Sequence, residues 1–109
     1  MTVREVSEKL GLTPVCEGEC DTKEVKGCHI GDLLSLVMSK AQSGDVWITI
    51  QGNVNVPAVA SLTDAAMVIL AEGVKLDDAA KMRAEQEEIC IYSSEKSAFW
   101  LACKIKECL

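Results

Sequence analysis

The feature that most constrains the fold is a pair of β-branched and apolar runs, at residues 46–50 and 66–70. A strand with one solvated face alternates apolar and polar residues, and these two segments do not. Both faces of each strand must therefore be covered, which is typical of a parallel sheet between layers of helices. The length of 109 residues leaves room for one such domain.

Helical segments alternate with strand-like segments along the rest of the chain. We expect strands at residues 25–30, 46–50, 66–70 and 89–92, with a further extended segment at 13–16. We expect helices at residues 3–10, 33–42, 58–62, 78–88 and 95–107. The sequence therefore predicts a single α/β domain over residues 1–109, a mostly parallel sheet with helices on both faces.

Several of the expected helices are preceded by polar residues that are suited to cap their N-termini. Thr2 and Glu5 have the spacing of a capping box, and Asp32 precedes the second helix. Ser93 or Ser94 is expected to cap the last helix.

The charge of the chain excludes several classes of partner. The formal net charge is −6, and no cluster of basic residues is available to neutralise phosphates, so we expect neither nucleic-acid nor anionic-membrane binding.

The charged first segment, residues 1–11, lacks the apolar stretch of a signal peptide. The longest apolar run, residues 65–71, is too short to cross a bilayer. We therefore expect a cytoplasmic protein.

Six cysteines are many for a chain of this length. They are Cys16, Cys20, Cys28, Cys90, Cys103 and Cys108. A reducing compartment predicts free thiols rather than a disulfide framework, and Cys90 and Cys103 suit small buried hydrophobes. The chain has no Cys-x-x-Cys pair, so no metal is predicted. A three-thiolate site over Cys16, Cys20 and Cys28, or reversible thiol chemistry, stays open as an alternative.

Catalytic motifs are missing from the sequence. No glycine is followed by lysine, so a phosphate-binding loop of the kinase type is absent, as is a Gly-x-Gly-x-x-Gly fingerprint. His29 is the single histidine, and its neighbour Cys28 should point to the opposite face of a strand. We predict that the chain is not an enzyme and binds no cofactor. The remote alternative is a minor enzymatic activity that uses His29.

A ligand site is predicted where the parallel strands end, because ligands of open α/β sheets bind beyond the carboxyl ends of the strands. Helix N-termini at that edge also favour anions. We expect the loops there to form one rim; the alternative is ordinary caps and turns. The predicted ligand-binding residues are His29, Gly31, Asp32, Gln51, Gly52, Asn53, Asn55, Gly73, Ser93 and Ser94.

The last expected helix, at residues 95–107, carries apolar residues over more of its circumference than a single narrow apolar face would occupy. A helix that is apolar over much of its circumference is usually buried on more than one side. We therefore predict a homodimer, with Phe99, Trp100 and Cys103 in the interface.

Several short segments together resemble the DRTGG domain family. They are residues 21–28 (DTKEVKGC), 31–35 (GDLLS), 44–51 (GDVWITIQ) and 58–62 (AVASL), followed by the next strand and Gly73. Two positions depart from the family pattern: Cys28 stands where a glycine is common, and Thr22 where an arginine is common. These departures would change any ligand contact made by that turn.

The resemblance implies a fold and a function class. DRTGG domains are similar in fold to the N-terminal domain of HPr kinase/phosphorylase, and this chain lacks the separate P-loop domain of that enzyme. Members accompany CBS pairs in some pyrophosphatases. The resemblance therefore implies a non-catalytic regulatory or interaction module, which we expect to bind an adenine nucleotide or another small anion and to act on a partner enzyme. The alternative is a cysteine-dependent redox or metal-binding accessory protein, for example of an iron hydrogenase.

Overall fold

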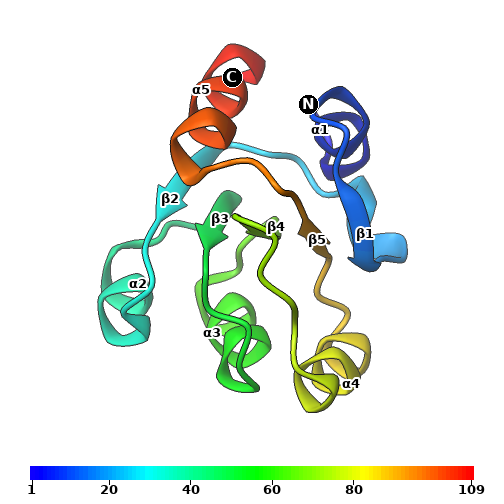
Figure 1. Ribbon diagram of the computed structural model, residues 1–109, viewed down its shortest axis with the longest axis vertical. Coiled ribbons are helices and arrows are strands. Elements are labelled where there is room, and N and C mark those ends of the chain that lie inside the picture. Colours follow the sequence, from blue (N-terminus) through cyan, green and yellow to red (C-terminus); the bar gives the residue numbers. More distant parts are fainter.

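A computed structural model describes residues 1–109 as a five-stranded sheet flanked by helices (Figure 1). The strand order is β1-β5-β4-β3-β2. The strands are β1 (Thr13–Cys16), β2 (Gly27–Ile30), β3 (Asp45–Thr49), β4 (Met67–Leu70) and β5 (Ile91–Ser93). The helices are α1 (Val3–Lys9), the short 3-10 helix η1 (Glu19–Thr22), α2 (Leu34–Lys40), α3 (Asn55–Thr63), α4 (Asp78–Glu87) and α5 (Ala98–Cys108).

The sheet separates two hydrophobic cores. In Figure 1, α1 and α5 cover one face, while α2, α3 and α4 cover the other. Side chains alternate between the faces, so Ile48 joins the core under α1 and α5, and Trp47 joins the core under α2 and α3. The predicted fold class, a mostly parallel α/β sheet with helices on both faces, is confirmed.

The two segments that fixed this prediction form the centre of the sheet. Every residue of β3 and β4 is buried. They pair in parallel, with Trp47 opposite Val68 and Ile48 opposite Ile69. β2 and β5 extend the parallel ladder on either side. β1 pairs antiparallel with β5 and closes one edge, while β2 is the other edge.

The predicted caps have different outcomes. The capping box of Thr2 and Glu5 is present. Asp32 does not cap α2, whose N-cap is Leu33, because its carboxylate accepts hydrogen bonds from the end of β3. Neither Ser93 nor Ser94 caps α5: β5 continues through Ser93, and Ser97 caps the helix by accepting a hydrogen bond from the Trp100 N–H.

The prediction that all cysteines are thiols is wrong. Cys20 and Cys90 form a disulfide that ties η1 to the residue before β5, across 70 positions of sequence. The two residues are distant in sequence but meet over the core beneath α1, so spacing alone gave no sign of the pair. Cys90 is buried, as predicted, but as half of a cross-link.

The helices are short, and none of them has the length and apolar character that spanning a bilayer requires.

Candidate functional site

A hollow of about 330 Å³ lies at the carboxyl ends of β4 and β5. It contains three of the predicted ligand-binding residues, Gly73, Ser93 and Ser94. Thr13 lies opposite Ser93 in the antiparallel pair, so the start of β1 forms another wall. The remaining lining residues, which are not among the ten predicted ligand-binding residues, are Val15, Val74, Lys75, Leu76 and Glu95. We call this the β4–β5 hollow.

Backbone hydrogen bonds hold the two loops of the hollow together. The Gly73 N–H donates to the Ser94 carbonyl at 2.9 Å, and the Ser94 N–H donates to the Leu70 carbonyl at 3.0 Å. Gly73 has a φ of +71°, and the Glu95 carboxylate lies where a side chain at position 73 would begin. The positive φ favours glycine there, whereas the flexible Glu95 side chain could move away from a Cβ at this position. The hollow is therefore a built feature of the two loops.

The lining of the hollow combines apolar and charged groups. Val15, Val74 and Leu76 give it a hydrophobic part. Lys75 is exposed and takes no part in the ion pairs of the chain, so its ammonium is free to meet an anion. Such a mixture suits a ligand with a flat apolar portion and a negatively charged end.

The other predicted rim residues are used in the fold itself. Asp32 Oδ1 accepts hydrogen bonds from Thr49 Oγ1 at 2.8 Å and from the Ile50 N–H at 2.9 Å. The Trp47 indole N–H donates to the Gly31 carbonyl at 2.8 Å. These bonds join the end of β2 to the end of β3. Asp32 and Gly31 therefore do not line the β4–β5 hollow.

The amide-rich loop after β3 is also internally bonded. Asn53 Nδ2 donates to Gln51 Oε1 at 3.2 Å, and Asn53 Oδ1 accepts from the Asn55 N–H at 3.0 Å. The backbone of Gly52 lies against the Lys75 carbonyl, and a Cβ at Gly52 would come within 2.2 Å of that oxygen. Gly52 thus joins the loop after β3 to the loop that carries Lys75, whereas the Gln51 and Asn53 side chains bond within the turn.

His29 and Cys28 lie on opposite faces of β2, as predicted. The His29 ring lies beside Gly31, where α2 packs, and Cys28 packs against the core beneath α5. Burial raises the pKa of the Cys28 thiol to about 11, with a smaller contribution from the nearby Asp45. A thiol with so high a pKa is a weak nucleophile at neutral pH. The two residues do not form a catalytic pair.

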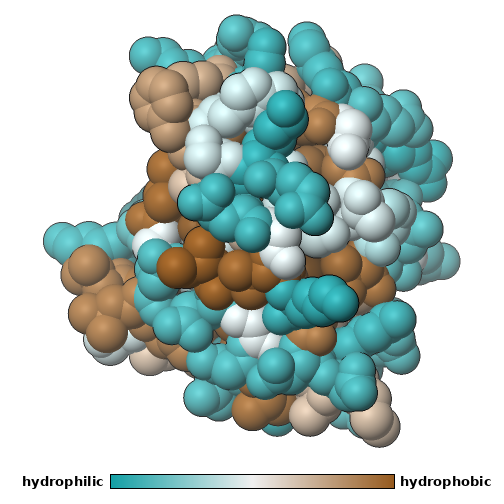
Figure 2. Space-filling model, in the orientation of Figure 1, coloured by the Kyte–Doolittle hydropathy of each residue, from teal (hydrophilic) through white to brown (hydrophobic).

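An apolar surface lies where the first half of the rim was predicted. Leu33 is 66% exposed, and Ile30, Leu36 and Ile50 are each about half exposed. Figure 2 shows hydrophobic side chains gathered on the side of the molecule where β2 and α2 lie. The polar residues that line the β4–β5 hollow thus lie at one end of the predicted rim, and hydrophobic side chains are exposed at the other end.

The predicted interface residues of α5 differ in exposure. Phe99 is 78% exposed and Cys103 is exposed one turn later. Trp100 is half-buried against the core, with the ammoniums of Lys96 and Lys104 at 5.1 and 5.6 Å from its ring centre. Trp100 is therefore largely engaged within its own chain, and Phe99 is the free aromatic side chain.

The three-thiolate site considered for Cys16, Cys20 and Cys28 is wrong. Cys20 is bonded to Cys90, and the other two thiols lie in different cores, Cys16 among the residues beneath α4 and Cys28 beneath α5. Burial also raises the pKa of Cys16.

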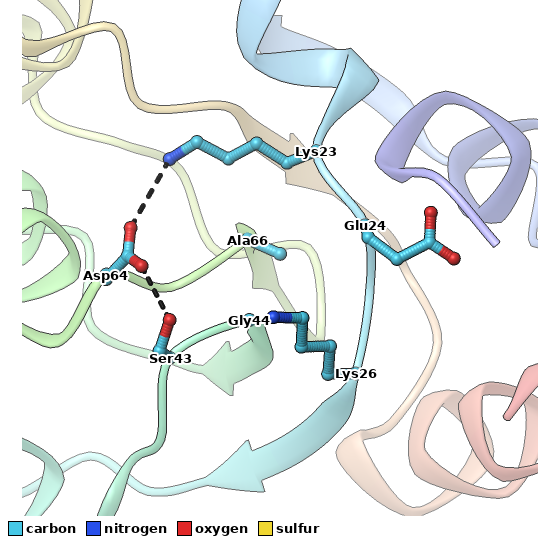
Figure 3. A pocket seen from close by; sticks show the side chains of 7 residues that line it. All are labelled: Lys23, Glu24, Lys26, Ser43, Gly44, Asp64 and Ala66. Atoms are coloured by element: carbon cyan, nitrogen blue, oxygen red, sulfur yellow. Dashed lines mark hydrogen bonds and ion pairs between the residues drawn. The ribbon is translucent and has the colours of Figure 1, made fainter.

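A second hollow lies at the opposite, amino-terminal ends of β2, β3 and β4 (Figure 3). It measures about 210 Å³ and is bordered by polar residues of three turns. The lining residues are Lys23, Glu24, Lys26, Ser43, Gly44, Asp64 and Ala66. Ligand sites are expected at the other edge of a parallel sheet, so none of these residues is among the predicted ligand-binding residues. The available signal was its lysine pair, within the segment 21–28.

Comparison with known proteins identifies the fold. No family model matches the chain, and no curated protein sequence matches it. The solved structure of the CBS and DRTGG domains of the regulatory region of Clostridium perfringens pyrophosphatase, complexed with the activator diadenosine tetraphosphate, matches with a TM-score of 0.75. The match covers 95% of this chain at 12% identity and 45% of that chain. It is consistent with the DRTGG-type fold that the resemblance implied.

Proposed function

We propose that this chain is a non-catalytic regulatory module that binds an adenine nucleotide, or a small anion of similar chemistry, in the β4–β5 hollow. The observation that carries the proposal is the free ammonium of Lys75 beside apolar walls and the hydroxyls of Ser93 and Ser94. These groups lie at the edge of a parallel sheet where ligands are usually bound.

The lining fits the two parts of a nucleotide. Val15, Val74 and Leu76 offer apolar contact to a base, and Glu95 offers an acceptor to an amino or hydroxyl group. Lys75 and the serine hydroxyls offer a cation and donors to phosphate oxygens. One charged contact in an exposed hollow predicts modest affinity, which suits a sensor of an abundant metabolite.

The comparison supports a regulatory role. The matched region belongs to the regulatory part of a pyrophosphatase and is complexed with an adenine dinucleotide activator. By analogy, the nucleotide would alter the contact between this module and a partner enzyme.

A thermal-shift panel with AMP, ADP, ATP and diadenosine tetraphosphate tests this function. A ligand at about 1,000 times its Kd stabilises the folded state by about 4 kcal/mol, so the active nucleotide should raise the Tm clearly. Lys75→Gln should weaken binding about fivefold, the effect of losing one exposed charge contact. Lys106→Gln, at the far end of α5, is the matched control.

The proposal is wrong if none of the four nucleotides raises the Tm. It is also wrong if Lys75→Gln binds the nucleotide as tightly as the wild-type chain and the control Lys106→Gln do. Binding would then lie outside the β4–β5 hollow.

A second candidate function is a cysteine-dependent redox accessory role, which the Cys20–Cys90 disulfide favours. Oxidation of the two thiols releases two protons and passes two electrons to a disulfide oxidant, and a dithiol reverses the step. Thiol labelling after denaturation should count four thiols in the oxidised chain and six after reduction. A count of six after incubation with oxidised glutathione would exclude this role.

A further inference from the structure

We propose that the hollow at the amino-terminal ends of β2, β3 and β4 binds a phosphate group through Lys23, Lys26 and Ser43. It lies at the opposite end of the sheet from the β4–β5 hollow, so the inference does not depend on the function proposed above.

Three turns fix the walls of this hollow. The segment before β2 is held to the start of α1, because the Val3 N–H donates to the Lys23 carbonyl and the Val25 N–H donates to the Met1 carbonyl. The turn before β3 is held to the same segment by the Lys26 N–H, which donates to the Gly44 carbonyl at 2.9 Å. The lysine side chains therefore start from an ordered backbone.

Lys26 is positioned over Gly44 and has no acidic partner. A Cβ at Gly44 would lie 2.8 Å from Lys26 Cδ, so the lysine stem packs directly on the glycine backbone. Figure 3 shows its ammonium beside Gly44 at the hollow. Lys26 does not occur among the ion pairs of the chain. The stem of Lys26 is thus held on Gly44, and its exposed ammonium is available to an anion at the hollow.

The two carboxylates of the hollow behave differently. Glu24 is directed away from it, and its Oε1 accepts a hydrogen bond from the N-terminal ammonium at 3.0 Å (Figure 3). Asp64 faces the hollow, where Oδ2 accepts from Ser43 Oγ at 2.6 Å and Oδ1 lies 3.9 Å from Lys23 Nζ. Asp64 thus occupies the position in which an external oxyanion would meet the same hydroxyl and the same ammonium.

This arrangement makes Asp64 an internal competitor of the ligand. Its side chain is 70% exposed, so it can turn toward water when an anion arrives. A phosphate group would gain contacts with both lysines and Ser43, whereas Asp64 contacts Ser43 and, at 3.9 Å, Lys23 but not Lys26. The volume of about 210 Å³ suits a phosphate group, whether it is free or the end of a larger phosphomonoester.

The test is a titration of the ¹⁵N-labelled chain with inorganic phosphate, followed by two-dimensional NMR. Amide shifts should concentrate at Ser43, Gly44 and Ala66. Lys26→Gln should weaken binding about threefold, and Asp64→Asn should tighten it about threefold, because each change removes one exposed charge. Asp64 has a φ of +54°, a conformation that asparagine tolerates well, so this variant should keep its fold.

Lys81→Gln is the matched control, because it removes an exposed lysine of α4 that lines neither hollow, and it should leave the phosphate titration unchanged. A parallel titration with AMP distinguishes the two sources of the phosphate group. Tighter binding of AMP at the same amides indicates a phosphomonoester, and equal binding indicates free phosphate. Shifts confined to other residues, or an Asp64→Asn variant that binds no tighter than wild type, would overturn the proposal.

Discussion

At the scale of single residues, Asp32 joins the ends of β2 and β3. One carboxylate oxygen accepts from both the Thr49 hydroxyl and the Ile50 N–H. We expect Asp32→Ala to lower the free energy of unfolding by about 1–2 kcal/mol, since both donors lose their partner. Urea unfolding measures this. Asp77→Ala is the control, because its side chain makes no capping hydrogen bond, and equal losses in the two variants would contradict the assigned role.

Cys28 makes stability depend on pH in the alkaline range. The folded state holds the thiol proton more tightly than the unfolded state, because the folded pKa is about 11 and the ordinary value is 9.0. This contribution is complete below pH 9 and is lost as the pH rises toward 11. Cys28→Ala should flatten the decline in Tm over that window. Cys103→Ser, at an exposed thiol, should not, and identical profiles for wild type and Cys28→Ala would refute the effect.

The structural role of a residue could be predicted from the sequence where its hydrogen-bond partner is only a few positions away. The capping box of Thr2 and Glu5 follows from a spacing of three residues. The role of Asp32 did not follow, because its partners lie 17 and 18 positions away on another strand. The place of Lys75 in the hollow did not follow for the same reason, because its neighbours there come from β1 and β5.

At the scale of elements, the Cys20–Cys90 disulfide connects η1 to the start of β5. A cross-link that closes a loop of 70 residues restricts the unfolded chain and stabilises the fold by about 4 kcal/mol in the chain-entropy model. We expect reduction to lower the free energy of unfolding by up to this amount in urea titrations. The Cys20→Ser/Cys90→Ser variant should unfold alike with and without reductant, and a wild-type chain indifferent to reductant would show that no such bond forms.

Element types were predictable from periodicity, and their ends were less so. The buried runs of β3 and β4 carry a pattern that only a covered strand produces. α3 begins at Asn55 and ends at Thr63, beyond the predicted range of 58–62 at both ends. The predicted strand at 89–92 is shifted to Ile91–Ser93, because its position is set by pairing with β4 and β1.

At the scale of the whole molecule, we propose a homodimer that includes the exposed face of α5. Phe99 is the most exposed large hydrophobic residue of the chain, so Phe99→Asp should convert dimers to monomers in light scattering coupled to gel filtration. Leu62→Asp, at a similarly exposed residue on α3, is the control. A monomeric wild-type chain at micromolar concentration would contradict this proposal.

The predicted architecture of the whole molecule is confirmed, and the ligand site stays a prediction. Strands covered on both faces require two helical layers, so the fold class followed from two segments of sequence. The sequence predicts one rim over the ends of all four parallel strands, whereas the hollow lies at β4 and β5 and exposed hydrophobic side chains lie at β2 and α2. The order of the strands places β4 and β5 beside β1 and places β2 at the opposite edge of the sheet. The local sequence does not specify this order.

The most direct test of the regulatory proposal is a two-dimensional NMR titration of the ¹⁵N-labelled chain with ATP. We predict amide shifts at Gly73, Lys75, Ser93 and Ser94, with much smaller shifts near Asp32 and Asn53. Lys75→Gln should reduce the shifts of the β4–β5 hollow while leaving those of Ser43 and Gly44 unchanged. A spectrum in which the β4–β5 amides do not move at saturating ATP, whatever happens at the opposite end of the sheet, would contradict the proposed ligand site.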